Sequence, residues 1–88
     1  LSASLAEERY RLAVSKNALN DLWAGLDEAT RDKLSAQQTL WVRQRDARCD
    51  LSSKEAETDQ NQRELIKVRC LAAENERRIS GLQRYSNW

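Results

Sequence analysis

The chain has 88 residues, of which 33% are charged, and it contains no proline and two glycines. This length predicts one domain over residues 1–88, and this composition favours helices over a turn-rich β fold. The net charge of +1 argues against a nucleic-acid partner, and no apolar run reaches the roughly 18 residues of a membrane-spanning helix.

The first expected helix covers about residues 3–25. Along it, leucines recur every seven residues, at Leu5, Leu12, Leu19 and Leu26. This spacing puts them on one buried face of the helix. Ser2 or Ser4 could cap its start, and Ser4 and Glu7 have the spacing of a capping box. Glu7 and Glu8 belong to the opposite face, where we expect solvated charges.

A stop signal follows at Gly25-Leu26-Asp27. Gly25 suits the left-handed position that ends many helices, and Asp27 suits the N-cap of the next helix. So short a turn makes neighbouring helices antiparallel. The second helix is expected at 28–51. Its inward face would include Leu34, Gln38, Trp41, Val42, Arg45 and Cys49.

Residues 52–62 contain one apolar residue, Ala56, and we interpret them as a loop. A single helical turn at its start is the alternative, because Ser52 and Glu55 have capping-box spacing. The third helix is expected at 60–85, with its apolar residues at Leu65, Ile66, Val68, Cys70, Leu71, Ala72, Ile79 and Leu82. The predicted fold is therefore all-α, an antiparallel up-down-up three-helix bundle.

Antiparallel packing predicts which residues lie level with each other. For two residues that lie level on either side of the first turn, the residue numbers add up to about 53. This pairs Leu19 with Leu34 and Leu12 with Trp41. About the two cysteines the sum is 119, which places Trp41 level with Arg78 and Arg45 level with Glu74. All three helices then contribute to one layer around Trp41, and this agreement between registers supports the bundle.

Cys49 and Cys70 are the two cysteines of the chain, and both fall on inward helix faces. A helical hairpin can bring them to the Cα separation of about 5.5 Å that a disulfide needs. We expect that bond, which would stabilise the fold by about 3 kcal/mol in the chain-entropy model. Two free thiols in the core are the alternative. A disulfide would favour an oxidising compartment.

The sequence lacks the residue types on which most catalytic sites depend. The chain has no histidine, so the usual general base at neutral pH and the usual nucleophilic triads are missing. The cysteines are 21 residues apart rather than in a C-x-x-C pair, and carboxylate clusters read most simply as solvated charge. We therefore expect no enzyme, no catalytic residue, no metal and no cofactor.

Three side chains leave alternatives open. Trp41 is interpreted as core because its spacing matches the apolar stripe, with a ligand platform as the alternative. Arg45 either forms a surface ion pair with Asp46 or bridges to Glu74 on the third helix. Arg78 reads as part of a solvated face with Arg77, or it lies over Trp41 as a cation–π contact.

The spacing of these residues resembles the lysozyme inhibitor LprI-like N-terminal domain family over about residues 5–85. The family pattern LN-x-x-aromatic-x-x-L, Q-x-x-W-x-x-x-RD-x-x-C and C-x₄-T-x-x-R-x₃-L matches Leu19, Asn20, Trp23, Leu26, Gln38, Trp41, Arg45, Asp46, Cys49, Cys70, Arg78 and Leu82. Asn75 stands where the family usually has threonine. A further upstream cysteine of many members is absent from this chain.

The resemblance implies a small exported bacterial protein of the periplasm, cell envelope or extracellular space. No signal peptide is recognisable at Leu1, so we expect a mature or trimmed form. The resemblance names a lysozyme as partner, and a lysozyme inhibitor as the function. The alternative is a structural or accessory envelope module without that activity.

The most acidic segment of the chain, and a candidate contact for a partner, lies between the two cysteines. Glu55, Glu57 and Asp59 face one cation, Lys54, within residues 52–59. A bond between Cys49 and Cys70 would hold the ends of this segment, and basic lysozymes would be steered towards it. We name these three acidic residues as candidate lysozyme contacts. An ordinary solvated connection is the alternative interpretation.

Overall fold

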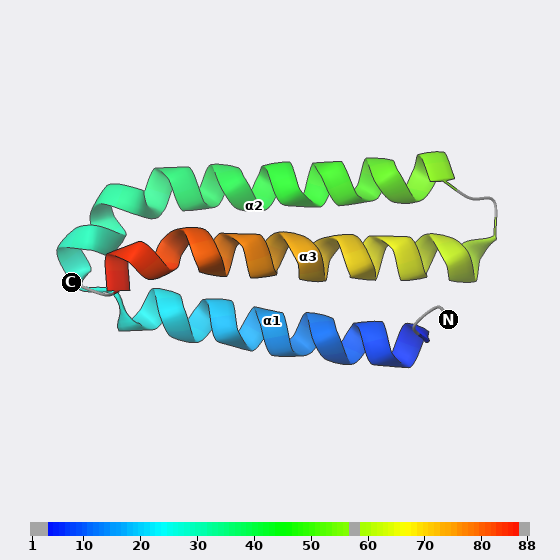
Figure 1. Cartoon of the computed structure of the whole chain (residues 1–88). Coiled ribbons are helices and arrows are strands. Elements are labelled where there is room, and N and C mark those ends of the chain that lie inside the picture. The colour runs from blue at the N-terminus through cyan, green and yellow to red at the C-terminus, as the bar shows by residue number, and fades with distance from the viewer. Residues whose placement is uncertain (1–3, 57–58, 87–88) are drawn as a thin grey trace.

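Three long helices make up the computed structural model, which describes residues 4–56 and 59–86. They are α1 (Leu5–Gly25), α2 (Glu28–Ala56) and α3 (Gln60–Ser86), and no strand occurs in the described residues. The chain runs along α1, back along α2 and forward again along α3 (Figure 1). This confirms the predicted all-α, up-down-up fold.

The helix starts follow the capping signals. The Glu7 backbone N–H donates to Ser4 Oγ at 3.1 Å, and the Thr30 N–H donates to Asp27 Oδ1 at 2.8 Å. Each bond satisfies a backbone donor that a helix leaves free in its first turn. The bond from Thr30 also holds the pKa of Asp27 below its ordinary value. The predicted cap residues Ser4 and Asp27 are confirmed, and the alternative cap Ser2 lies outside the described residues.

The end of α1 differs from the expectation for Gly25. No described glycine has a positive φ, so the left-handed cap is wrong. Instead, Leu26 takes an extended conformation, and its N–H donates to the Trp23 carbonyl at 3.2 Å. The guanidinium of Arg31 donates to the carbonyls of Ala24, at 3.0 Å, and Leu26. An arginine of α2 therefore satisfies carbonyls at the end of α1 and in the turn that follows.

α2 extends five residues beyond the predicted end at residue 51. The interpretation of 52–56 as a loop is therefore wrong, and the alternative of a helical turn there is confirmed. Lysine, glutamate and alanine are strong helix formers even without an apolar face. Lys54 pairs with Asp50 one turn earlier at 3.0 Å, a spacing that supports a helix. Ser53 is buried, and its hydroxyl donates to the Arg63 carbonyl of α3 at 2.8 Å.

α3 is the central helix of the molecule. It packs against both α1 and α2, whereas α1 and α2 touch each other little, and Figure 1 shows α3 between them. The pairing of α1 with α2 by the sum of 53 therefore does not describe a helix–helix interface, although Leu19 and Leu34 do share one buried cluster. The sum of 119 holds for α2 and α3, since Arg78 lies over Trp41. α1 lies parallel to α3, with Ser15 opposite Asn75.

The apolar core lies towards the end of the molecule where α1 turns into α2. Leu19, Leu26, Leu34 and Leu82 form its buried cluster, and the side chains packed on it are Leu22, Trp23, Trp41, Ile79 and Tyr85. All three helices contribute to this cluster. Further along α3, Val68 and Ala72 are buried too, so the contacts of α3 extend along most of its length.

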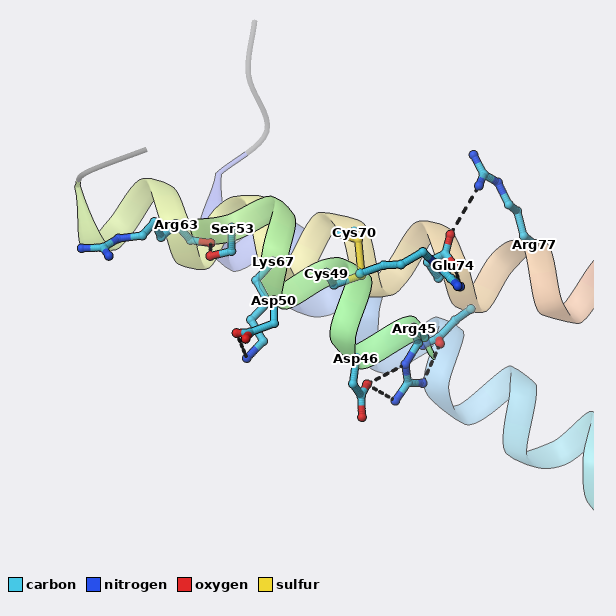
Figure 2. Close-up of a disulfide and its surroundings, with 12 residues drawn as sticks. Arg45, Asp46, Cys49, Asp50, Ser53, Arg63, Lys67, Cys70, Glu74 and Arg77 are labelled. Atoms are coloured by element: carbon cyan, nitrogen blue, oxygen red, sulfur yellow. Dashed lines mark hydrogen bonds and ion pairs between the residues drawn. A yellow bond between two sulfur atoms is a disulfide. The ribbon is translucent and has the colours of Figure 1, made fainter. Parts of the chain in front are cut away.

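A disulfide joins α2 to α3, as the positions of the cysteines predicted. The Cys49 and Cys70 sulfur atoms are bonded, and their Cα atoms are 5.4 Å apart. Cys49 is fully buried. In Figure 2 the bond crosses directly between the two helices, with Asp50 and Lys67 reaching across on one side and Ser53 near Arg63. The α2–α3 hairpin is therefore closed covalently.

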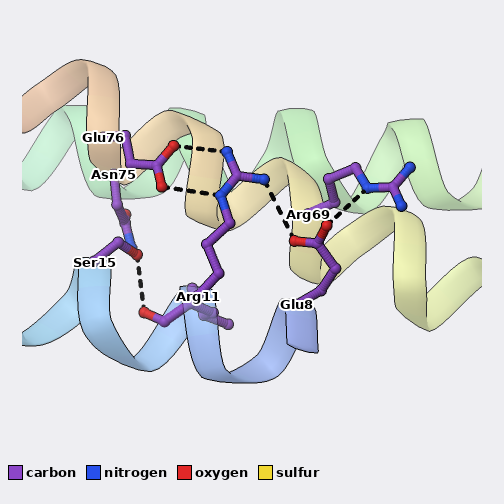
Figure 3. Close-up of polar contacts among 7 residues, drawn as sticks. Glu8, Arg11, Ser15, Arg69, Asn75 and Glu76 are labelled. Carbon is purple, nitrogen blue, oxygen red and sulfur yellow. Dashed lines mark hydrogen bonds and ion pairs between the residues drawn. The ribbon is translucent and has the colours of Figure 1, made fainter. Parts of the chain in front are cut away.

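An ion-pair network joins α1 to α3 (Figure 3). Glu8 is 6% exposed and contacts Arg11 and Arg69, each at 3.3 Å. Arg11 also donates to both carboxylate oxygens of Glu76, at 2.9 and 2.6 Å. The expectation of a solvated Glu8 is therefore wrong, because one of its two partners, Arg69, lies on α3, which periodicity along α1 does not reveal. The network ties α1 to α3 rather than to α2.

Candidate functional site

A groove lies where α1 and α2 fail to meet. It has a volume of about 470 Å³ and opens to solvent along one side of the molecule. We call it the α1/α2 groove. Its lining comes from α1 (Leu12, Lys16, Leu19, Asn20, Trp23), from α2 (Gln38, Trp41, Val42, Arg45) and from α3 (Leu71, Asn75). Concave sites of this size commonly hold small ligands, so this is the candidate site.

Trp41 stands in the wall formed by α2, between two arginines. The guanidinium carbons of Arg45 and Arg78 lie 5.1 and 5.5 Å from its ring centroid. Both distances are within the range of a cation–π contact. Trp41 is partly buried, packs against the core and faces the groove. Trp41 therefore has features of both predicted roles, a core residue and a platform for a ligand.

Arg78 comes from α3 and fixes the position of Gln38. Its Nε donates to Gln38 Oε1 at 2.8 Å. Its Nη2 is buried without a hydrogen-bond partner in the described structure, and the nearby Trp41 ring supplies the attraction instead. Burial lowers the pKa of Arg78 from its ordinary value, yet arginine stays charged at neutral pH. Its place in a solvated face is therefore wrong.

Asn75 connects the three helices at the floor of the groove. Its Nδ2 donates to Ser15 Oγ on α1 at 3.2 Å, and its Oδ1 accepts from Arg45 Nη1 on α2 at 3.0 Å. Ser15 Oγ in turn donates to the Leu12 carbonyl at 2.8 Å. Asn75 is 2% exposed, and a buried amide needs such partners to avoid a desolvation cost. The chain of bonds sets the separation of the groove walls.

Arg45 pairs with Asp46, the nearer in sequence of its two expected partners. Its Nε and Nη2 donate to Asp46 Oδ1 at 2.9 and 2.8 Å, while its third contact is Asn75. Glu74 pairs with Arg48 and with Arg77 instead. The alternative of an Arg45–Glu74 bridge is therefore wrong, because Arg48 approaches Glu74 from the next turn of α2. Asp46 lies outside the groove and orients Arg45.

The remaining predicted residues occupy two regions. Leu19, Leu34 and Leu82 are buried in the core. Glu55 and Asp59 are exposed at the far end of the α2–α3 hairpin, and Glu57 lies outside the described residues. Asp59 caps α3, since its Oδ1 accepts the Asn61 N–H at 2.7 Å. The structure does not bring these acidic residues to the α1/α2 groove.

Sequence reasoning named Leu12, Leu19, Asn20 and Trp23 on α1, but it missed Lys16 and the groove that these residues line. Leu12, Lys16, Asn20 and Trp23 recur every three or four residues, the spacing of one helix face. That face was visible in the sequence, but its lysine and asparagine argued for solvent rather than for a wall. Ser15 carried no signal at all, because its role depends on Asn75.

The site offers no metal centre and no recognisable catalytic set. Within residues 4–56 and 59–86, no three histidine, cysteine or acidic side chains gather closely enough to hold a metal ion. No helix in the same part of the chain is long and apolar enough to cross a membrane. What the groove does offer is an aromatic and aliphatic interior with amides and cations at its edge, which suits binding.

Comparison with known proteins agrees with the residue pattern. A family model described as lysozyme inhibitor LprI matches residues 3–82. No curated protein and no solved structure matches the chain. The matched range contains both cysteines and every residue that lines the α1/α2 groove.

Proposed function

This chain belongs to the lysozyme inhibitor LprI family, and on that premise we propose that it is an exported, non-catalytic protein that binds and inhibits a lysozyme. The family match over residues 3–82 carries the proposal. The disulfide between Cys49 and Cys70 supports an oxidising location such as the periplasm, the envelope or the extracellular space.

We place the contact with lysozyme at the far end of the α2–α3 hairpin. Glu55 and Asp59 are exposed there, and Glu57 lies between them in the sequence. Lys54 pairs with Asp50 and so does not neutralise Glu55. Lysozymes of the common animal type are strongly basic, so these carboxylates would speed the encounter.

Rigidity supports this placement. The disulfide closes the hairpin, and the bond from Ser53 Oγ to the Arg63 carbonyl braces the two helices near their ends. Glu55 lies on a helix rather than in the loop expected from the sequence, because α2 continues to Ala56. A pre-ordered surface loses less conformational entropy on binding than a flexible loop does.

A turbidity assay tests the inhibition itself. Lysozyme clears a suspension of bacterial cell walls, and we expect the folded protein to slow clearing in a dose-dependent, saturable way. The reduced and alkylated protein provides a matched control of the same sequence. If the folded, disulfide-bonded protein leaves the clearing rate unchanged at every dose, the accessory envelope module becomes the better account.

Neutralising these three carboxylates tests the location of the lysozyme contact. The variant Glu55→Gln/Glu57→Gln/Asp59→Asn removes three charges, and asparagine keeps the cap of α3. We expect slower association with lysozyme, most strongly at low salt, with helicity unchanged. The control Asp21→Asn/Glu28→Gln/Asp32→Asn removes three charges at the opposite end of the molecule. Equal effects of the two variants at low salt would exclude the hairpin end as the site.

A further inference from the structure

The α1/α2 groove carries positive charge that the proposed lysozyme contact does not use. Lys16 and Arg45 are its charged lining residues, and no aspartate or glutamate of the described chain lines it. Lys16 is exposed and makes no ion pair or hydrogen bond within residues 4–56 and 59–86. Arg45 is paired with Asp46 and bonded to Asn75, so the uncompensated positive charge among the described lining residues comes from Lys16. A ligand of complementary charge is therefore anionic.

The uncharged lining indicates a ligand with flat apolar faces and polar edges. Trp23 and Trp41 contribute indole rings, and no cation of the described chain lies over the Trp23 ring. Asn20 is exposed, and the amide nitrogen of Gln38 is left over after its oxygen accepts from Arg78. Sugar rings offer C–H faces to aromatic rings, and hydroxyl edges to amides that both donate and accept.

The groove walls disfavour an extended peptide. Both walls are helices, so their backbone N–H and C=O groups are already bonded within α1 and α2. A peptide lying between them would leave most of its own backbone groups unpaired, which costs free energy where water is excluded. A sugar has no such backbone. The α2 lining spans Gln38 to Arg45, or roughly 10 Å at the rise of a helix, which limits the ligand to a short segment.

We propose that the α1/α2 groove binds a short oligosaccharide that carries carboxylates, the chemistry of the bacterial cell-wall glycan. Lys16 contacts a carboxylate, Trp23 and Trp41 contact the sugar faces, and Asn20 and Gln38 bond the hydroxyl and acetamido groups. This site is separate from the hairpin end, and the proposal does not rest on inhibition of lysozyme.

Two soluble tetrasaccharides test the proposal without any lysozyme present. One alternates N-acetylglucosamine with N-acetylmuramic acid, and the other, N-acetylchitotetraose, lacks the carboxylates. Each is titrated into the ¹⁵N-labelled protein while the indole N–H signals are followed, assigned by single Trp→Phe variants. We expect the acidic sugar to shift the signals of Trp23 and Trp41 saturably, and the neutral sugar to bind at least fivefold more weakly.

Variants at Lys16 test the role of charge. Lys16→Gln should weaken binding of the acidic sugar about three- to fivefold, the size expected for one exposed ion pair. Lys16→Arg should restore it. Lys33→Gln is the matched control, because Lys33 is exposed on α2 and does not line the groove. Both residues lie on the surface, so the fold should survive each change.

Three results would overturn the proposal. The first is the absence of any saturable shift at Trp23 and Trp41 with the acidic sugar. The second is equal binding of the two sugars, or an equal effect of Lys16→Gln and Lys33→Gln. The third is saturable binding of an acidic peptide in the groove by a protein that ignores both sugars. Inhibition in the turbidity assay could persist in all three cases, so the two proposals fail separately.

Discussion

Asn75 shows how much a single residue decides in this protein. Its amide joins Ser15 on α1 to Arg45 on α2, and Asn75 itself lies on α3. An amide separates its donor and acceptor atoms, so it can reach two helices on opposite sides. Because Asn75 is buried, loss of either partner would leave a polar group unpaired.

At the same scale, the pair of Arg11 and Glu76 makes stability depend on pH. The bonds from Arg11 hold the pKa of Glu76 below its ordinary value in the folded protein. The contribution is therefore complete above the pKa of the unfolded chain, near 4.3, and is lost as the pH falls through the lower folded value.

We expect Glu76→Gln to lower stability at pH 7 and to make the loss of stability on acidification shallower. Because both side chains are well exposed, the effect at pH 7 should stay below about 1 kcal/mol. Urea unfolding at pH 7 and between pH 2 and 5 measures it. An acid limb identical to that of the unaltered protein would show that this pair contributes nothing.

Gly81 is a weak helix former at a helical position of α3. It lies inside α3, its φ is not positive, and a Cβ added there would meet nothing within 4 Å. We expect Gly81→Ala to stabilise the protein by about 0.5–1 kcal/mol, because alanine loses less backbone entropy on folding. Gly25→Ala, at the last residue of α1, should gain less. A lower unfolding midpoint for Gly81→Ala would contradict this account.

At the scale of elements, the two partners of α3 are held by different means. α2 is held by the disulfide, by Ser53 and by the contacts of Trp41 with Arg78. α1 is held by leucine packing and by the network around Glu8 and Arg11. Only the first connection is covalent, so the two halves of the molecule respond differently to reducing conditions.

Reduction should weaken the α2–α3 hairpin. The bond closes a segment of 21 residues, for which the chain-entropy model gives about 3 kcal/mol. Domains of this size are stable by about 5–15 kcal/mol, so the urea midpoint should fall visibly with reductant. The Cys49→Ser/Cys70→Ser variant should show a low midpoint that reductant does not change. An unshifted midpoint for the unaltered protein would mean that the bond adds no stability.

The whole molecule is elongated rather than globular. Its extents are 45, 23 and 14 Å, and its radius of gyration over Cα atoms is 14.5 Å. A compact chain of this length would have a radius of gyration of about 12 Å. The excess follows from long helices that lie side by side along a central α3 (Figure 1). The same arrangement leaves the α1/α2 groove open to solvent.

Small-angle X-ray scattering tests this shape in solution. We expect a concentration-independent radius of gyration close to 14.5 Å. The Cys49→Ser/Cys70→Ser variant should give a larger value if α2 separates from α3 without the bond. A value near 12 Å for the unaltered protein would show that the three long helices do not extend side by side in solution.

Sequence reasoning succeeded where the signals are local. Ser4 and Asp27 mark helix starts because a cap acts over three residues. Cys49 with Cys70, and Trp41 with Arg78, could be paired because one covalent bond fixes the register of a whole antiparallel hairpin. The end of α2 was placed too early, since helix propensity and the Lys54–Asp50 pair outweighed the lack of apolar residues.

By itself, then, the sequence determined three helices, their order, their main caps, the disulfide and the register of α2 against α3. Only the tertiary structure decided that α3 is central, that Glu8 is buried and that a cationic groove separates α1 from α2. The physical reason is that an amphipathic face has the same period whichever partner covers it. The choice between partners is made by all three helices together, here by the disulfide that joins α2 to α3 and by the arginine–glutamate network that joins α1 to α3.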